Sequence, residues 1–379
     1  MDPHLHATRV LLAIVRERFD DARALVRQDG LDDAAFVAAC RASDVHPWVH
    51  ARLDRAEAAG IAGSAALEQL AALRAQVRRD NLLLLARAEE ALAALGRAGV
   101  RPVVLKGTDF LHRLYRSFDE RTLDDVDLLV RPTDLAASLR ALVAAGFRLP
   151  DEPRALHYVR TSHHVPLGGP GPIGVDFELH WNLAQAGRFR IDPAALVERA
   201  VPLRVGSETA LRLASPDVVA HLVLHHFTHY FDRRLKWVVD LGCIVRAEPL
   251  DWPAVVETLR AWGASQPAAA ALRHIRKLAP DLVPEQVLRA LPLAPWRAAL
   301  ARPLLASHPL ELWRGTRRRG VQLYLAAVLH ERPGDLPGWL LHRRRRERGP
   351  SDHPLDAIVR ALAAPPDRTG RASAALGDR

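Results

Sequence analysis

The chain has 379 residues, of which 49% are hydrophobic and 26% are charged, and its formal net charge is +9. This composition excludes a disordered chain, and the absence of an apolar run of about 18 residues argues against a membrane-spanning helix. The charge would suit a nucleic-acid partner, but only three of the 53 basic residues are lysines. Much of the excess lies in Arg317–Arg319 and Arg343–Arg346, which we interpret as solvated faces or tail.

The two cysteines, Cys40 and Cys243, lie far apart in apolar helical contexts. No CxxC and no Cys/His finger spacing is present, which argues against a structural zinc site and a disulfide framework. This cysteine usage favours a reducing, cytoplasmic location. Residues 1–20 lack a small-residue cleavage site and predict the start of a helix, not an export signal.

Residues 1–98 predict a helical N-terminal region. Apolar residues recur at helical spacing over 10–15, 67–73 and 81–95, and breakers at Gly30, Pro47 and 60–63 divide the region into about four helices. No catalytic constellation occurs there.

Residues 99–205 predict a small α/β core with alternating strand and helix signals. The expected elements are, in chain order, a strand over 100–105, a helix from an N-cap at Thr108 to 115, a strand over 123–130, a helix over 133–145, a third strand beginning near Phe147, and a hairpin over 163–167 and 175–181. Residues 206–348 predict a helical C-terminal region, and 349–379 a flexible tail with a turn at 355–362. The fold class expected is therefore α+β, a small mixed sheet flanked by helical regions.

The first chemical signal is Asp125-Val126-Asp127 inside an apolar strand. Side chains two apart on a strand project from the same face, so the two carboxylates are held together. Like charges this close repel unless a cation lies between them, and carboxylate oxygens favour Mg²⁺. A D-x-D pattern is weak on its own, because acidic loops are common.

The second signal is Leu105-Lys106-Gly107-Thr108, at a predicted strand-to-helix turn. A helix N-terminus preceded by glycine favours an anion such as phosphate, and Thr108 adds a hydroxyl. Lys106 stands out because this chain nearly always uses arginine, and lysine acts on phosphate as a compact charge. A plain turn with a solvent-facing lysine is the alternative.

The third signal is the strand around Asp176, Glu178 and His180, whose alternation places these three on one face. A half-exposed edge strand is the plain alternative. His221, His225 and His229 show i, i+4 spacing on a predicted helix, but no H-E-x-x-H motif and no suitably spaced carboxylate accompanies them. We interpret these histidines as packing near the cleft or in the core.

The order of these signals resembles the DNA polymerase beta-like nucleotidyltransferase fold, and more closely an uncharacterised bacterial nucleotidyltransferase family within that superfamily. The resemblance rests on an L-K-G segment at 105–107, an R-x-x-x-D-x-D-L-L-V segment at 121–130, an E-L-H-W segment at 178–181, and a helical segment at 235–241. It covers roughly residues 30–265. The superfamily usually has glycine–serine where this chain has Gly107-Thr108.

The resemblance implies an enzyme that moves a nucleoside monophosphate from a nucleoside triphosphate to a hydroxyl of a small molecule, peptide or protein. Asp125 and Asp127 would hold two Mg²⁺ ions, with Mn²⁺ as the alternative, and Glu178 or Asp176 would be the third carboxylate. The residues expected to bind the nucleotide are Lys106, Gly107, Thr108 and Arg121. The alternative function is a catalytically inactive relative that binds a partner or, through the arginine-rich C-terminal segment, nucleic acid.

Overall fold

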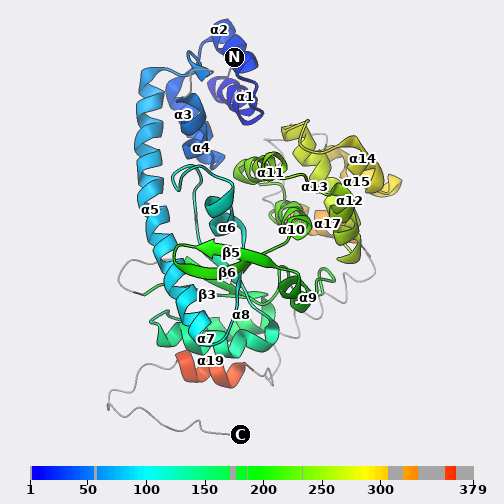
Figure 1. Cartoon of the computed structure of the whole chain (residues 1–379). Coiled ribbons are helices and arrows are strands. Elements are labelled where there is room, and N and C mark those ends of the chain that lie inside the picture. Colours follow the sequence, from blue (N-terminus) through cyan, green and yellow to red (C-terminus); the bar gives the residue numbers. More distant parts are fainter. Residues whose placement is uncertain are drawn as a thin grey trace.

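The computed structural model describes residues 2–54, 58–170, 176–185, 187–232, 234–305, 319–331 and 355–363. Over these residues the fold is α+β, as predicted, with one mixed sheet between groups of helices (Figure 1). The strands are β1 (Val103–Val104), β2 (Val126–Leu129), β3 (His164–Gly168), β4 (Asp176–His180), β5 (Val201–Val205) and β6 (Glu208–Arg212). Arg317, Arg318 and Arg343–Arg346 lie outside the described residues.

The sheet has the strand order β3-β4-β2-β1-β6-β5. The central strand β2 runs antiparallel to β1 and parallel to β4, and the hairpins β3–β4 and β5–β6 form the two edges. All four residues of β2 are buried, which explains why its sequence is apolar except for Asp127. The carboxylate at this position therefore lies at the centre of the sheet.

The helices fall into three groups along the chain. The N-terminal group is α1 (Pro3–Val15), α2 (Phe19–Asp29), α3 (Asp33–Ala42), α4 (His46–Leu53) and the long α5 (Ser64–Arg97). Around the sheet lie α6 (Lys106–Arg113), η2 (Pro132–Asp134), α7 (Leu135–Ala144), α8 (Glu152–Thr161) and α9 (Pro193–Glu198). The C-terminal group is α10 (Ser215–Thr228), α11 (Lys236–Ala247), α12 (Trp252–Ala261), α13 (Ser265–Leu278), α14 (Glu285–Ala290), α15 (Pro295–Leu305), α17 (Arg319–Leu329) and α19 (Asp356–Ala363).

In the N-terminal group, the helices divide near Pro47, as predicted, because α3 ends at Ala42 and α4 begins at His46. Pro47 occupies the first turn of α4, where a proline costs no backbone hydrogen bond. Helix α5 runs along one side of the molecule and connects this group to the sheet (Figure 1). Cys40 and Cys243 are both free and buried, as expected.

The strand predicted near Phe147 is wrong. Phe147 follows α7 as a single buried ring, with its centroid 5.2 Å from that of Phe177 in an edge contact. Only Arg148 bridges to Gly168, and α8 then begins after its N-cap at Asp151. The buried Phe147 alone gave the sequence pattern of a strand, although no strand forms there.

The boundary predicted between the core (99–205) and the C-terminal helical region (206–348) lies inside a hairpin. The boundary predicted at residue 205 falls between β5 and β6, and β6 pairs in parallel with β1. Helix α19 lies within the expected tail and packs against α8, where Arg160 binds Asp356 with an N–O distance of 2.6 Å.

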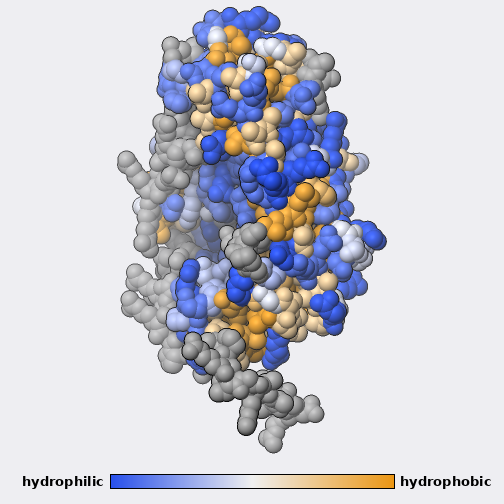
Figure 2. Space-filling model, turned by 90° about the vertical axis from the view of Figure 1, so that its left-hand side faces the viewer, coloured by the Kyte–Doolittle hydropathy of each residue, from blue (hydrophilic) through white to orange (hydrophobic). Residues whose placement is uncertain are grey.

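The surface on the α5 side carries separate apolar patches among hydrophilic residues (Figure 2). Within the described residues, no helix is both long enough and apolar enough to span a membrane, because even α5 is interrupted by charged residues throughout its length.

Candidate active site

The turn after β1 brings Lys106 toward the D-x-D strand. Helix α6 begins at Lys106 itself, with Leu105 as its N-cap, so the N-cap predicted at Thr108 is wrong. Lys106 has a φ of 44°, an uncommon backbone conformation for a residue with a side chain. Its Nζ lies 3.0 Å from Asp127 Oδ2. Burial lowers the pKa of Lys106, but Asp127 and Asp125 outweigh burial and raise it, so the lysine is held charged.

Asp125 immediately precedes β2 and Asp127 is its second residue, and their environments differ. Asp127 is buried and receives Lys106 on one oxygen and His180 Nε2 on the other, at 2.8 Å. Burial raises the pKa of Asp127, but these two partners hold it well below its usual range. Burial and the charge of Asp127 raise the pKa of Asp125 to about 7. The pair therefore resists carrying two negative charges unless a cation joins it.

Strand β4 adds Glu178 and His180 to the same face. The parallel register sets Asp127 opposite Glu178, while Phe177 and Leu179 are buried on the other face, as the alternation predicted. His180 Nε2 lies 3.2 Å from Glu178 Oε2. Burial lowers the pKa of His180, but hydrogen bonds to Asp127 and Glu178 raise it.

Asp176 is the first residue of β4, and its side chain lies outside the described part of the structure. The choice between Glu178 and Asp176 as third carboxylate therefore stays a prediction. Of these two carboxylates, only that of Glu178 is described, and it lines the same cavity as Lys106 and Asp125.

Arg121, predicted as a nucleotide ligand, has a carboxylate partner inside the protein. Its guanidinium is buried in a paired contact with Asp240 of α11, Nε to Oδ1 at 2.8 Å and Nη2 to Oδ2 at 2.9 Å. This contact also explains Gly107, because a Cβ there would lie 2.3 Å from Arg121 Nη1 and 2.5 Å from Leu123 Cδ2. Thr108 is buried, and its hydroxyl has no hydrogen-bond partner among the described residues.

A cavity of about 430 Å³ opens beside the carboxylates, between the sheet and α10. Lys106, Asp125 and Glu178 contribute to its wall. So do several residues to which the sequence analysis assigned no site role: His163, His164, His180, Arg188, Phe189, His221, His225, His229, Tyr230 and Trp262. His180 of the E-L-H-W segment and the i, i+4 histidines of α10, interpreted above as packing near the cleft or in the core, were local signals for this wall. No sequence signal pointed to Arg188, because one arginine does not stand out in a chain so rich in arginine.

The wall of this cavity contains neutral histidines and a half-buried arginine. Burial, and then the nearby charge of Lys106, lower the pKa of His221 to about 3 and that of His225 well below its usual value, so both rings are neutral. Arg188 lies over the rings of Phe189 and Phe227, at 5.7 and 5.8 Å. It has no carboxylate partner among the described residues. A cation in this position is suited to an anionic ligand.

The donor set fits a divalent cation. Asp127, Glu178 and His180 each offer a ligand atom, and these atoms lie within 4.8 Å of one another. Asp125, with its pKa raised by burial and a like charge, completes an oxygen-rich group of the kind Mg²⁺ prefers.

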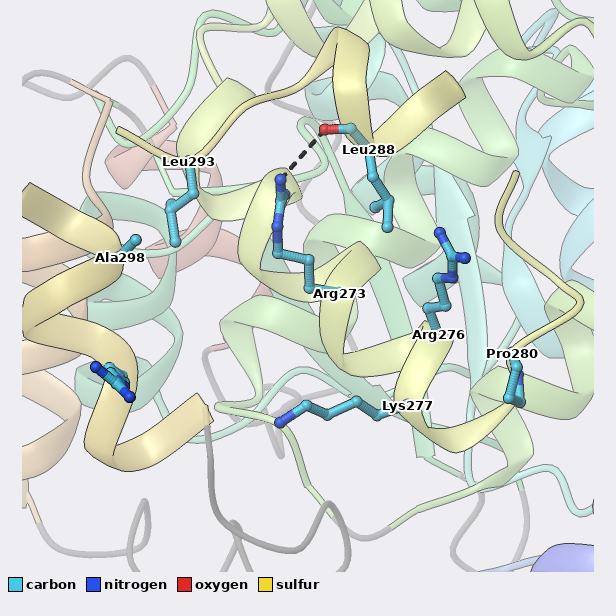
Figure 3. Close-up of a pocket in the computed structure, with 8 residues that line it drawn as sticks. Arg273, Arg276, Lys277, Pro280, Leu288, Leu293 and Ala298 are labelled. Atoms are coloured by element: carbon cyan, nitrogen blue, oxygen red, sulfur yellow. Dashed lines mark hydrogen bonds between the residues drawn. The ribbon is translucent and has the colours of Figure 1, made fainter. Parts of the chain in front are cut away.

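A larger cavity of about 770 Å³ lies away from these residues, among α13, α14 and α15 (Figure 3). Its described lining is basic and apolar and contains no carboxylate. Arg273 donates to the carbonyl oxygens of Ala269, Leu288 and Leu291, and Arg276 pairs with Glu285. These arginines hold helix ends together, so this cavity lacks the groups for metal-assisted chemistry.

Comparison with known proteins identifies a family for the chain. No curated protein and no solved structure shows significant similarity to the chain. A family model described as uncharacterised nucleotidyltransferase matches residues 29–280, a span that contains the whole sheet, Lys106, the D-x-D strand and the cavity wall. The match covers well over half of the sequence, and the chain belongs to this uncharacterised nucleotidyltransferase family.

Proposed function

We propose that the protein transfers a nucleoside monophosphate from a nucleoside triphosphate to a hydroxyl group of a small molecule, peptide or protein, as in the DNA polymerase beta-like superfamily. The observation that carries the proposal is the convergence of Lys106, Asp125, Asp127 and Glu178 beside one cavity. A buried lysine, a carboxylate with a raised pKa and an adjacent empty volume are together typical of a catalytic centre.

Asp125, Asp127 and Glu178 are the residues that would hold Mg²⁺ or Mn²⁺. When bound, the metal would neutralise phosphate charge and make the acceptor hydroxyl more acidic. Lys106 and the first-turn N–H groups of α6 would bind the phosphates, since both favour negative charge. His180 would keep Asp127 oriented through its 2.8 Å hydrogen bond.

The remaining wall of the cavity suggests how the substrate is held. Arg188 offers a cation to a phosphate or carboxylate, and Phe189, Tyr230 and Trp262 offer rings against a base or an apolar body. Glu178, or Asp176 in its place, would accept the proton of the acceptor hydroxyl. Pyrophosphate would leave.

The test is incubation of the full chain with each labelled nucleoside triphosphate, Mg²⁺ and a small-molecule extract, with pyrophosphate release and the mass of labelled products as readouts. Asp125→Asn should abolish transfer and leave the fold intact. Asp127→Asn should also abolish transfer, in a protein that still folds but is less stable, because Lys106 and His180 lose their buried partner. Asp134→Asn, a carboxylate just beyond the other end of β2, is the matched control and should transfer normally.

Full activity in Asp127→Asn would end this proposal. Absence of transfer with all four nucleotides, in a folded protein that still binds Mn²⁺, would favour the alternative of an inactive, partner-binding relative.

A further inference from the structure

Three histidines from two adjacent strands meet on the cavity wall. His163 immediately precedes β3, His164 begins it, and the antiparallel register sets His164 directly opposite His180 of β4. The ring centroids are 4.8 Å apart for His163 and His164, 4.9 Å for His164 and His180, and 5.5 Å for His163 and His180. A nitrogen from each ring lies within 4.8 Å of the other two. Small side-chain rotations would bring all three onto one ion.

These rings have nitrogen atoms that their surroundings do not use. Nδ1 of His163 and Nδ1 of His180 are buried and have no hydrogen-bond partner among the described residues. A buried polar atom left without a partner is destabilising, so these two nitrogens call for a ligand.

The charges around the cluster favour a cation. Glu178 approaches His180 at 3.2 Å and His164 at 3.6 Å, and Asp127 lies beyond it. Lys106 is the opposing positive charge, but it is already paired with Asp127. Glu178 is therefore the negative charge left to face the histidines.

We propose that His163, His164 and His180 form a binding site for a divalent transition-metal ion of the Zn²⁺ class, which overlaps the carboxylate site at His180. Imidazole nitrogen suits Zn²⁺, Co²⁺, Ni²⁺ and Cu²⁺, whereas Mg²⁺ selects oxygen. Three protein ligands with a fourth position open to water or to Glu178 is a familiar zinc arrangement.

The site has a regulatory consequence. Glu178 lies within reach of both ligand groups, so an ion on the histidines that takes Glu178 as its fourth ligand withdraws this carboxylate from the carboxylate site. Zn²⁺ therefore inhibits nucleotidyl transfer by competing with Mg²⁺ for shared ligands. This consequence rests on the proposed function, but the binding site itself does not.

The test uses the full chain freed of metal and titrated with Co²⁺, whose visible absorption is intense only in tetrahedral or five-coordinate sites. One Co²⁺ per chain should bind with such a spectrum, and Zn²⁺ should displace it. His163→Asn and His164→Asn, made separately, should each weaken Zn²⁺ by at least about a hundredfold, since even an outer-shell partner is worth ten- to a hundredfold. His157→Asn, an exposed histidine on α8, is the matched control and should bind as the wild type.

A spectrum typical of octahedral Co²⁺ in the wild type, or unchanged Zn²⁺ affinity in both variants, would overturn the site. X-ray absorption of the Zn²⁺-loaded wild type is independent of how well the variants fold. Three imidazole ligands support the proposal, and an oxygen-only shell refutes it. Asp125→Asn should lose transfer and keep the cobalt spectrum, so failure of the proposed function and failure of this site are distinguishable.

Discussion

The buried pair of Arg121 and Asp240 provides the sharpest test of how the site is held. Asp240 is fully buried, and its carboxylate accepts two hydrogen bonds from Arg121 and one from the Tyr115 hydroxyl at 2.7 Å. Burial lowers the pKa of Arg121, but Asp240 outweighs burial and raises it, so the guanidinium stays charged. Asp240→Asn removes the counter-charge while leaving Arg121 buried.

The expected loss of stability is large. Breaking a buried ion pair from one side costs about 3–5 kcal/mol, because the remaining charge has neither water nor a partner. With an m value of about 3 kcal/mol per M, the midpoint of urea unfolding should fall by about 1 M or more. Tyr115→Phe deletes a single hydrogen bond to the same carboxylate and should cost only about 1 kcal/mol. Tryptophan fluorescence in urea measures both.

Variants of the same ion pair distinguish two roles of Arg121, positioning of the D-x-D strand and binding of the nucleotide. If Arg121 positions the D-x-D strand through Asp240, Arg121→Lys should lower stability and leave KM for the nucleoside triphosphate within about twofold, because lysine cannot form the paired contact. If Arg121 binds the nucleotide, KM should rise at least tenfold with stability nearly unchanged. A stability loss below about 1 kcal/mol in both Asp240→Asn and Arg121→Lys would refute the reasoning from this ion pair.

Three further outcomes are expected. Glu178→Gln should lower turnover by about two to four orders of magnitude and Asp176→Asn by less, and the reverse ranking would move the third carboxylate by two residues. Gly107→Ala should destabilise the fold by about 1–3 kcal/mol, because the added Cβ would overlap the Arg121 guanidinium, and an unchanged urea midpoint would contradict this packing. Burial, and then the charge of His274, hold the pKa of His226 well below its unfolded value of about 6.5. Below pH 6.5 the ring of the unfolded chain takes up a proton and the buried ring does not. The free energy of unfolding is therefore unaffected by this group above pH 6.5 and falls as the pH is lowered, by about 1.4 kcal/mol at pH 5.5. Equal urea midpoints at pH 7.5 and 5.5 would exclude it.

The features predicted well from the sequence are those set by local periodicity. Strand alternation alone places Glu178 on the face opposite Phe177, and a parallel register then brings it to Asp127. The hairpin of β3 and β4 follows from two apolar runs around a glycine- and proline-rich loop. Each of these inferences needs only a few neighbouring residues.

The features predicted wrongly depend on residues distant in sequence. An N-cap at Thr108 is reasonable from residue type, but the N-cap is Leu105, three residues earlier. There Lys106 adopts a positive φ and lies within 3.0 Å of Asp127. A conformation of this kind persists only where tertiary contacts impose it, so local propensity does not reveal it. The partner of Arg121 is likewise 119 residues away.

These long-range contacts give the helical regions a role in the site. On α11, Lys236 and Asp240 are one turn apart and therefore lie on one face of the helix. Asp240 holds Arg121, while Lys236 Nζ lies 2.8 Å from Asp124 and 2.5 Å from Asp44 of the N-terminal group. Asp240 and Lys236 thus bind the first and the last residue of the segment 121–124, which leads directly to Asp125. Helix α11, which the sequence shows only as an amphipathic helix, therefore fixes the start of the D-x-D strand through these two ion pairs.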